Sequence, residues 1–144
     1  MGQVSASSSI TVDAPPERVF TALADYQNFR PRILSDHFQE YRVLEGGQGD
    51  GTVAEWRLQA TEKRVRDIHA NVAVAGTTIT EQDANSSLVT TYTVAPSGSG
   101  SQVTTTTEWS GAGGVKGFFE KTFAPLGLRK IQAELLANLQ RELA

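Results

Sequence analysis

The 144-residue chain contains no cysteine, two histidines and one methionine. The lack of cysteine excludes disulfides, thiolate metal ligands and thiol nucleophiles. A metal site would have to be built almost wholly from carboxylates, because neither His37 nor His69 has a partner at ligand spacing. We therefore expect no metal and no cofactor.

Excess charge and long apolar runs are also missing. Thirteen Lys and Arg residues against sixteen Asp and Glu residues give a formal net charge of −3, which disfavours a general nucleic-acid binder. No stretch approaches the roughly 18 apolar residues of a membrane span, and the first residues lack the basic start and apolar run of a secretory signal. We expect a cytoplasmic monomer with no nucleic-acid partner and no stable insertion into a membrane.

Apolar residues make up 39% of the chain, enough for a core, and the length suits one domain over residues 1–144. Alternating apolar residues over 4–12 predict a strand. Helical spacing of apolar residues then predicts a short helix over about 16–25. A second short helix is expected over 26–34, interrupted by Pro31.

The middle of the chain consists of alternating segments separated by turn residues, which predicts six more strands. These strands are expected at about 41–44, 53–59, 65–75, 77–81, 88–94 and 102–109. Connections this short favour consecutive antiparallel neighbours. After the glycines at 111–114 the apolar period becomes 3.6, which predicts a long terminal helix, bent or broken at Pro125 and Gly127. The order predicts an α+β fold in which a curved antiparallel sheet of about seven strands wraps around that helix.

Three segments carry a resemblance to a known family. Residues 10–20 match an opening strand followed by a Pro-x-x-Val-Trp/Phe helix, residues 25–31 resemble an Asp-x-x-x-Tyr/Phe-Pro-x-Trp segment without its last aromatic residue, and residues 43–53 resemble a hairpin. The chain is thereby identified as a member of the START-like superfamily, also called the Bet v 1-like, helix-grip or SRPBCC fold. It resembles the bacterial polyketide cyclase/dehydrase and lipid-transport branch. The superfamily includes carriers, sensors and enzymes, so the resemblance implies a fold more than an activity.

In such a fold, a ligand would lie between the concave face of the sheet and the long helix. Strand parity and the apolar stripe of the helix then predict the residues that line its site. The predicted ligand-binding residues are Tyr41, Trp56, Arg66, Ile68, Tyr92, Thr105, Thr107, Trp109, Phe118, Phe123, Leu128, Ile131 and Leu135. The same residues could instead fill an ordinary core.

Arg66 allows two interpretations. It shares the parity of Ile68, so its guanidinium could point inward and anchor an anionic group of a ligand. Alternatively, it lies at a strand end and reaches water, as the neighbouring Lys63 and Arg64 suggest.

Other polar residues give little support for catalysis. His69 has the parity of the solvent face, and His37 lies in a loop beside an aspartate, where a surface role is expected. A catalytic pair of carboxylates is not indicated, because the glutamates either share the parity of the solvent-facing strand residues or, like Glu81, lie beside a turn.

The sequence favours a non-enzymatic protein that binds or transports a hydrophobic small molecule such as a lipid, an isoprenoid or a polyketide-like compound. The alternative is a polyketide aromatase/cyclase or dehydrase that uses the same cavity, with Arg66 and Tyr92 as catalytic candidates that polarise a carbonyl or donate a proton. A protein-interaction module is a second alternative, against which the polar composition of the exposed strand parity counts.

Overall fold

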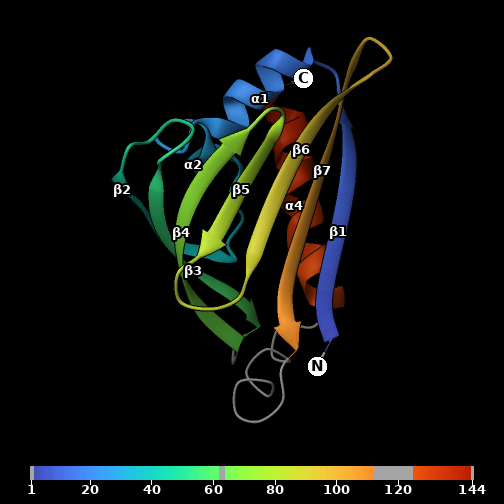
Figure 1. Ribbon diagram of the computed structural model, residues 1–144. Coiled ribbons are helices and arrows are strands. Elements are labelled where there is room, and N and C mark those ends of the chain that lie inside the picture. The colour runs from blue at the N-terminus through green and yellow to red at the C-terminus, as the bar shows by residue number, and fades with distance from the viewer. Residues whose placement is uncertain (1, 62–63, 112–124, 144) are drawn as a thin grey trace.

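The computed structural model describes residues 2–61, 64–111 and 125–143 (Figure 1). The first strand is followed by two short helices, in the order β1 (Gly2–Val12), α1 (Pro16–Ala24) and α2 (Arg30–Ile33). Six strands and a long helix follow, in the order β2 (Phe38–Glu45), β3 (Val53–Thr61), β4 (Arg64–Ala75), β5 (Thr78–Asp83), β6 (Val89–Ser97), β7 (Gly100–Gly111) and α4 (Pro125–Leu143).

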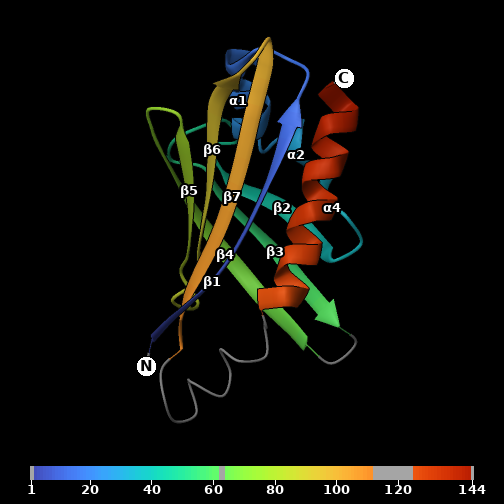
Figure 2. The same ribbon diagram turned by 90° about the vertical axis from the view of Figure 1, so that its right-hand side faces the viewer.

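The seven strands form one antiparallel sheet in the order β1-β7-β6-β5-β4-β3-β2. Strands β2 to β7 are consecutive neighbours, while β1 pairs with β7 from Gly2↔Gly111 to Val12↔Ser101. Therefore β1 and β2 lie at opposite edges, and α1 and α2 connect them across one end of the sheet (Figure 1). The helix α4 runs along one face of the curved sheet beside β1 (Figure 2). This arrangement confirms the predicted α+β helix-grip architecture.

Two helix boundaries differ from the predictions. The second helix is only four residues long, and Pro31 lies in its first turn, where a missing N–H breaks no hydrogen bond. The expected break at Gly127 is wrong, because α4 begins at Pro125 and continues through Gly127 to Leu143. A proline is tolerated at the first helical position, and a glycine costs only about 1 kcal/mol there. The apolar stripe of α4 offsets that cost by packing on the sheet.

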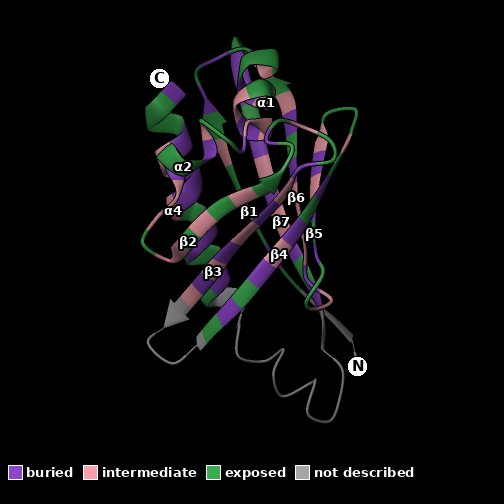
Figure 3. Ribbon diagram, turned by 90° about the vertical axis from the view of Figure 1, so that its left-hand side faces the viewer, coloured by how far each residue is buried: buried purple, intermediate pink, exposed green. Residues whose placement is uncertain are grey.

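The core lies between the sheet and α4. Burial alternates along β3 and β4, so that one face of each strand is dry and the other meets solvent (Figure 3). On β3 the buried residues include Ala54, Trp56 and Leu58, and α4 adds Leu135, Leu136 and Leu139 from the opposite side. Burying each large apolar side chain contributes roughly 1.5–3 kcal/mol.

The turn between β2 and β3 positions Tyr26. Gly47 in this turn has a φ of 135°, a conformation that favours glycine, and a Cβ there would lie 3.1 Å from the side-chain oxygen of Gln27. The Gly47 carbonyl accepts hydrogen bonds from the backbone N–H groups of Tyr26 and Gln27 at 2.8 and 3.0 Å. The turn therefore holds the loop between α1 and α2 against the sheet, with Tyr26 buried.

Candidate ligand-binding site

A cavity of about 50 Å³ lies between the sheet and α4. Its apolar walls come from β2, β3, β4, the β5–β6 loop and α4, namely Phe38, Trp56, Leu58, Ile68, Leu88, Leu128, Ile131 and Leu135. Its polar wall comes mainly from β5, β6 and β7, namely Glu81, Asp83, Thr90, Tyr92, Thr105, Thr107 and Gln132. The cavity is therefore apolar over most of its surface, with polar side chains gathered on the middle strands.

The structure places most of the residues predicted from strand parity and from the helix stripe around this cavity. They are Trp56, Ile68, Tyr92, Thr105, Thr107, Leu128, Ile131 and Leu135. Their role in binding a ligand stays a prediction. Phe118 and Phe123 lie outside the described residues.

Three predicted residues lie elsewhere. Tyr41 stacks on Trp56 with ring centroids 5.9 Å apart, and its hydroxyl donates to the Tyr26 carbonyl at 2.6 Å, so it lies behind the cavity wall. Trp109 is buried in the core without lining the cavity. Arg66 is also buried, with 3% of its surface exposed, and donates from Nη1 to Ser86 Oγ at 3.0 Å. The interpretation that Arg66 reaches water is therefore wrong, yet its side chain does not line the cavity.

A buried ion pair between Arg30 and Glu81 lies at the polar side of the cavity. The Arg30 guanidinium, only 3% exposed, lies between the rings of Tyr26 and Tyr92, at 4.3 and 4.5 Å from their centroids. Its Nη2 is 3.2 Å from Glu81 Oε2, and the Tyr26 hydroxyl donates to the same oxygen at 2.5 Å. Its Nε donates to the Leu23 carbonyl at 2.7 Å. These partners satisfy a charge that would otherwise be costly to bury.

The pKa values of this cluster are shifted in consistent directions. Burial, followed by the nearby Glu81 carboxylate, raises the pKa of Tyr92 to about 12. Burial also raises the pKa of Tyr26 well above its usual value. Burial alone would lower the pKa of Arg30, but the surrounding tyrosine and glutamate oxygens raise it instead. At neutral pH both phenols therefore keep their protons and can donate them in hydrogen bonds, while Arg30 stays charged.

This cluster was not predicted from the sequence. Glu81 was expected beside a turn, but β5 continues to Asp83 and Glu81 points inward, 5% exposed. Glu81 shares its strand parity with Ile79 and Asp83, both buried, and this parity could have predicted that Glu81 points inward. Arg30 gave no such signal, because it lies in a short helix next to a proline.

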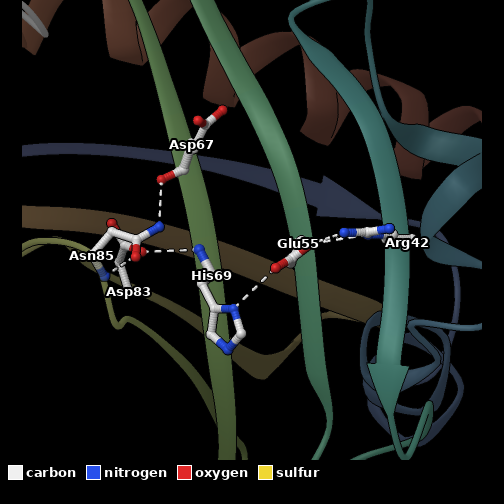
Figure 4. A network of polar contacts seen from close by, with 6 residues as sticks. All are labelled: Arg42, Glu55, Asp67, His69, Asp83 and Asn85. Atoms are coloured by element: carbon white, nitrogen blue, oxygen red, sulfur yellow. Dashed lines mark hydrogen bonds and ion pairs between the residues drawn. The ribbon is translucent and has the colours of Figure 1, made fainter.

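Asp83 joins the cavity wall to a polar network on the outer face (Figure 4). Its Oδ1 accepts the backbone N–H groups of His69 and Asn85 at 3.0 and 3.1 Å. On the outer face, Glu55 bridges two strands, with Oε2 3.2 Å from His69 Nδ1 and Oε1 2.8 Å from Arg42 Nη2. The hydrogen bonds from Arg42 and then His69 lower the pKa of Glu55. These charges are paired across strands and do not line the cavity.

His37 connects the loop before β2 to two other elements. Its Nδ1 lies 2.7 Å from the Gln59 carbonyl, and its Nε2 lies 3.4 Å from Glu134 on α4.

In residues 2–61, 64–111 and 125–143, no three His, Cys, Asp or Glu side chains gather so that they could hold a metal ion. None of the helices that the structure describes is both long and apolar enough to cross a membrane.

An open antiparallel sheet that grips a C-terminal helix, with short helices after its first strand, defines the Bet v 1-like class of fold. Ginseng major latex-like protein 151 from Panax ginseng superposes with a TM-score of 0.75 at 12% identity, over 98% of this chain and 97% of that chain. Truncated norcoclaurine synthase from Thalictrum flavum gives a TM-score of 0.71 at 16% identity, over 98% and 93%. At such identities the likeness concerns the fold alone.

The family is defined more narrowly by the sequence. The chain belongs to the family described as polyketide cyclase / dehydrase and lipid transport, which matches residues 3–144. It is also similar to the KanY protein, whose NMR solution structure shares 63% identity and a TM-score of 0.91 over 99% of each chain. A comparison with curated proteins gave no significant match. The family match confirms the resemblance drawn from the sequence.

Proposed function

We propose that the protein binds a hydrophobic small molecule in the cavity between the sheet and α4. The observation that carries this proposal is an interior cavity with mostly apolar walls and a few polar groups on one side, the usual construction of a small-molecule site. Membership in the polyketide cyclase/dehydrase and lipid-transport family supports hydrophobic ligand binding in general.

The size of the cavity implies that its walls move when a ligand enters. At about 50 Å³ it is several times smaller than the roughly 300–1,000 Å³ of pockets for drug-sized ligands. The helix α4 packs mainly on β1 and α2 and touches β3 only lightly. The cavity can therefore widen on its β3 side by rotation of the lining side chains, without loss of the hydrogen bonds by which Gln132 and Gln140 hold α4 to β1. A ligand that buries about 200 Å² of apolar surface would gain roughly 5 kcal/mol to offset this opening.

A cavity-filling variant tests the proposal. Ile131→Trp places a larger side chain at a lining position, whereas Ala133→Trp adds the same side chain at an exposed position on the same helix. Native mass spectrometry of purified protein should find a bound small molecule in the wild type and in Ala133→Trp, and less of it in Ile131→Trp. In titrations with the neutral fluorophore N-phenyl-1-naphthylamine, the wild type and Ala133→Trp should bind the fluorophore with similar affinity and Ile131→Trp should bind it more weakly. Absence of any bound molecule, together with equal fluorophore binding by all three proteins, would refute the proposal.

A catalytic role for the same cavity is the second candidate. The observation that favours it is a protonated phenol, Tyr92, beside the Glu81 carboxylate in the cavity wall. Such a phenol could polarise a carbonyl or donate a proton during cyclisation or dehydration of a polyketide-like substrate. Arg66 does not line the cavity, so Tyr92 is the candidate on which this second proposal rests. Tyr92→Phe should abolish turnover and leave substrate binding largely intact, and unchanged turnover would remove Tyr92 from the mechanism.

A further inference from the structure

We propose that the ligand carries an uncharged hydroxyl group, as an alcohol or a phenol does, and that Thr105 holds this group at the polar side of the cavity. The inference rests on the proposed function and narrows it to a class of ligand. Three observations support it. The Thr105 hydroxyl has no hydrogen-bond partner, the Glu81 carboxylate accepts hydrogen bonds at only one of its oxygens, and the buried charges are placed so that they disfavour an anionic ligand.

Thr105 supplies the unsatisfied hydroxyl. It lines the cavity, is 1% exposed, and its Oγ1 makes no hydrogen bond to any residue that the structure describes. Tyr92 is its partner in the β6–β7 register. The Thr105 hydroxyl lies near enough to the Tyr92 phenol to oppose the rise in the pKa of that phenol, but the two hydroxyl groups do not meet hydrogen-bond geometry. By contrast, the Thr107 hydroxyl lies 2.9 Å from that of Thr90 and accepts from Gln132 Nε2 at 3.3 Å. A buried hydroxyl without a partner is costly, so a ligand group that pairs with Thr105 would be favoured.

Glu81 supplies an acceptor that is only partly used. The contacts from Tyr26 and Arg30 both go to Oε2. Among the described residues, none donates to Oε1, although the side chain forms part of the cavity wall. A hydroxyl on the ligand can donate and accept, so it suits a wall that offers both the Thr105 hydroxyl and a carboxylate oxygen. A carboxylate on the ligand could accept only.

The buried charges are arranged against an anionic ligand. Two carboxylates, Glu81 and Asp83, line the cavity, while the arginines that balance them lie behind the wall. Arg30 contacts Glu81 directly at 3.2 Å, and Arg66 reaches Asp83 through Ser86, which donates to Asp83 Oδ2 at 2.7 Å. The buried charges are therefore balanced overall, but the carboxylates belong to lining residues and the guanidinium groups do not, and Glu81 still has an oxygen without a donor. A hydroxyl avoids the repulsion that a carboxylate would meet.

The test compares benzene, phenol and benzoate, which share a ring and differ in the polar group. Titrations at neutral pH are followed by NMR through the methyl signals of Ile68 and Ile131, which line the cavity. Wild-type protein should bind phenol roughly threefold to tenfold more tightly than benzene, and benzoate most weakly. Thr105→Val should abolish the preference for phenol, and Thr105→Ser should retain it. Thr106→Val is the matched control, because Thr106 is the next residue on β7 and pairs with Ser7 on the outer face.

The outcomes distinguish a failure of the Thr105 hydroxyl as an anchor for the ligand from a failure of ligand binding in the cavity. Equal affinity for phenol and benzoate, or an unchanged phenol preference in Thr105→Val, would overturn the hydroxyl anchor and leave apolar binding in place. If none of the three compounds shifts the cavity methyl signals, both the anchor and the proposed function are refuted. Backbone amide spectra of each variant establish that it is folded.

Discussion

Thr105 and Thr107 show how the value of a buried hydroxyl depends on its partners. Both line the cavity from β7, but only Thr107 is hydrogen-bonded, to Thr90 and Gln132. We expect Thr105→Val to raise the free energy of unfolding by about 1 kcal/mol and Thr107→Val to lower it by about 1–2 kcal/mol. Urea denaturation of the two variants measures the difference. A shift in the same direction for both would contradict the assigned contacts.

The Arg30–Glu81 pair is a second feature whose energy can be predicted. Arg30→Met leaves the Glu81 carboxylate buried without its cation, so the free energy of unfolding should fall by roughly 3–5 kcal/mol. Arg30→Met combined with Glu81→Leu should recover much of this loss, because both charges are then gone. Arg42→Met, at an exposed ion pair, is the control and should change stability little. A double variant less stable than Arg30→Met would show that the pair is not the dominant interaction.

At the scale of elements, β2 separates the cavity from solvent through one side chain. Phe38 lines the cavity on one side and, on the other, a surface depression that it shares with Leu34 and Tyr41. Its ring packs on Trp56 with centroids 6.3 Å apart. Rotation or removal of this ring would connect the cavity to the surface between α2 and β2.

This arrangement predicts a faster entry of ligand in Phe38→Ala. The association rate for N-phenyl-1-naphthylamine, measured by stopped-flow fluorescence, should rise roughly tenfold because a required conformational step is removed. Leu44→Ala, an exposed position on the same strand, should leave the rate unchanged. An unchanged rate in Phe38→Ala would place the entrance elsewhere.

The elements themselves were largely predictable because their patterns are local. Alternation of buried and exposed residues marks each strand when one face of a sheet is dry, as along β4 from Arg66 to Val72. The path of α4 through Gly127 was not predictable, because packing of the apolar stripe outweighed a local cost of about 1 kcal/mol.

At the scale of the whole molecule, the two sides of the cavity differ in how far the sequence could predict them. The apolar walls could be predicted, because strand parity and the apolar stripe of the helix are both visible within a few residues of the sequence. The polar cluster joins Tyr26 to Glu81, 55 residues apart, through the way the loop between α1 and α2 lies against the sheet. This approach depends on the topology and on the hydrogen bonds between the α1–α2 loop and Gly47. The glycines predict the turn, but no local pattern predicts which loop it contacts.

The tyrosines couple this packing to the stability of the molecule at high pH. Burial raises the pKa of all three tyrosines of the chain, Tyr26, Tyr41 and Tyr92, the last to about 12 from 10.0. Between pH 10 and 12 the unfolded chain therefore loses phenolic protons that the native protein retains. Since the native state then binds more protons, the free energy of unfolding falls as pH rises, by up to about 1.4 kcal/mol per pH unit for each tyrosine.

Alkaline titration tests this coupling directly. The stability contributed by the protonated tyrosines should be fully present below pH 10 and decline above it, with a smaller slope in Tyr92→Phe. Because every tyrosine of the chain is affected, tyrosinate absorbance should appear together with the loss of circular dichroism, in one transition. Tyrosinate that forms near pH 10 while the circular dichroism stays native would mean that the phenols titrate in the folded protein at their ordinary pKa. The buried cluster around Arg30 would then be open to solvent, contrary to the structure.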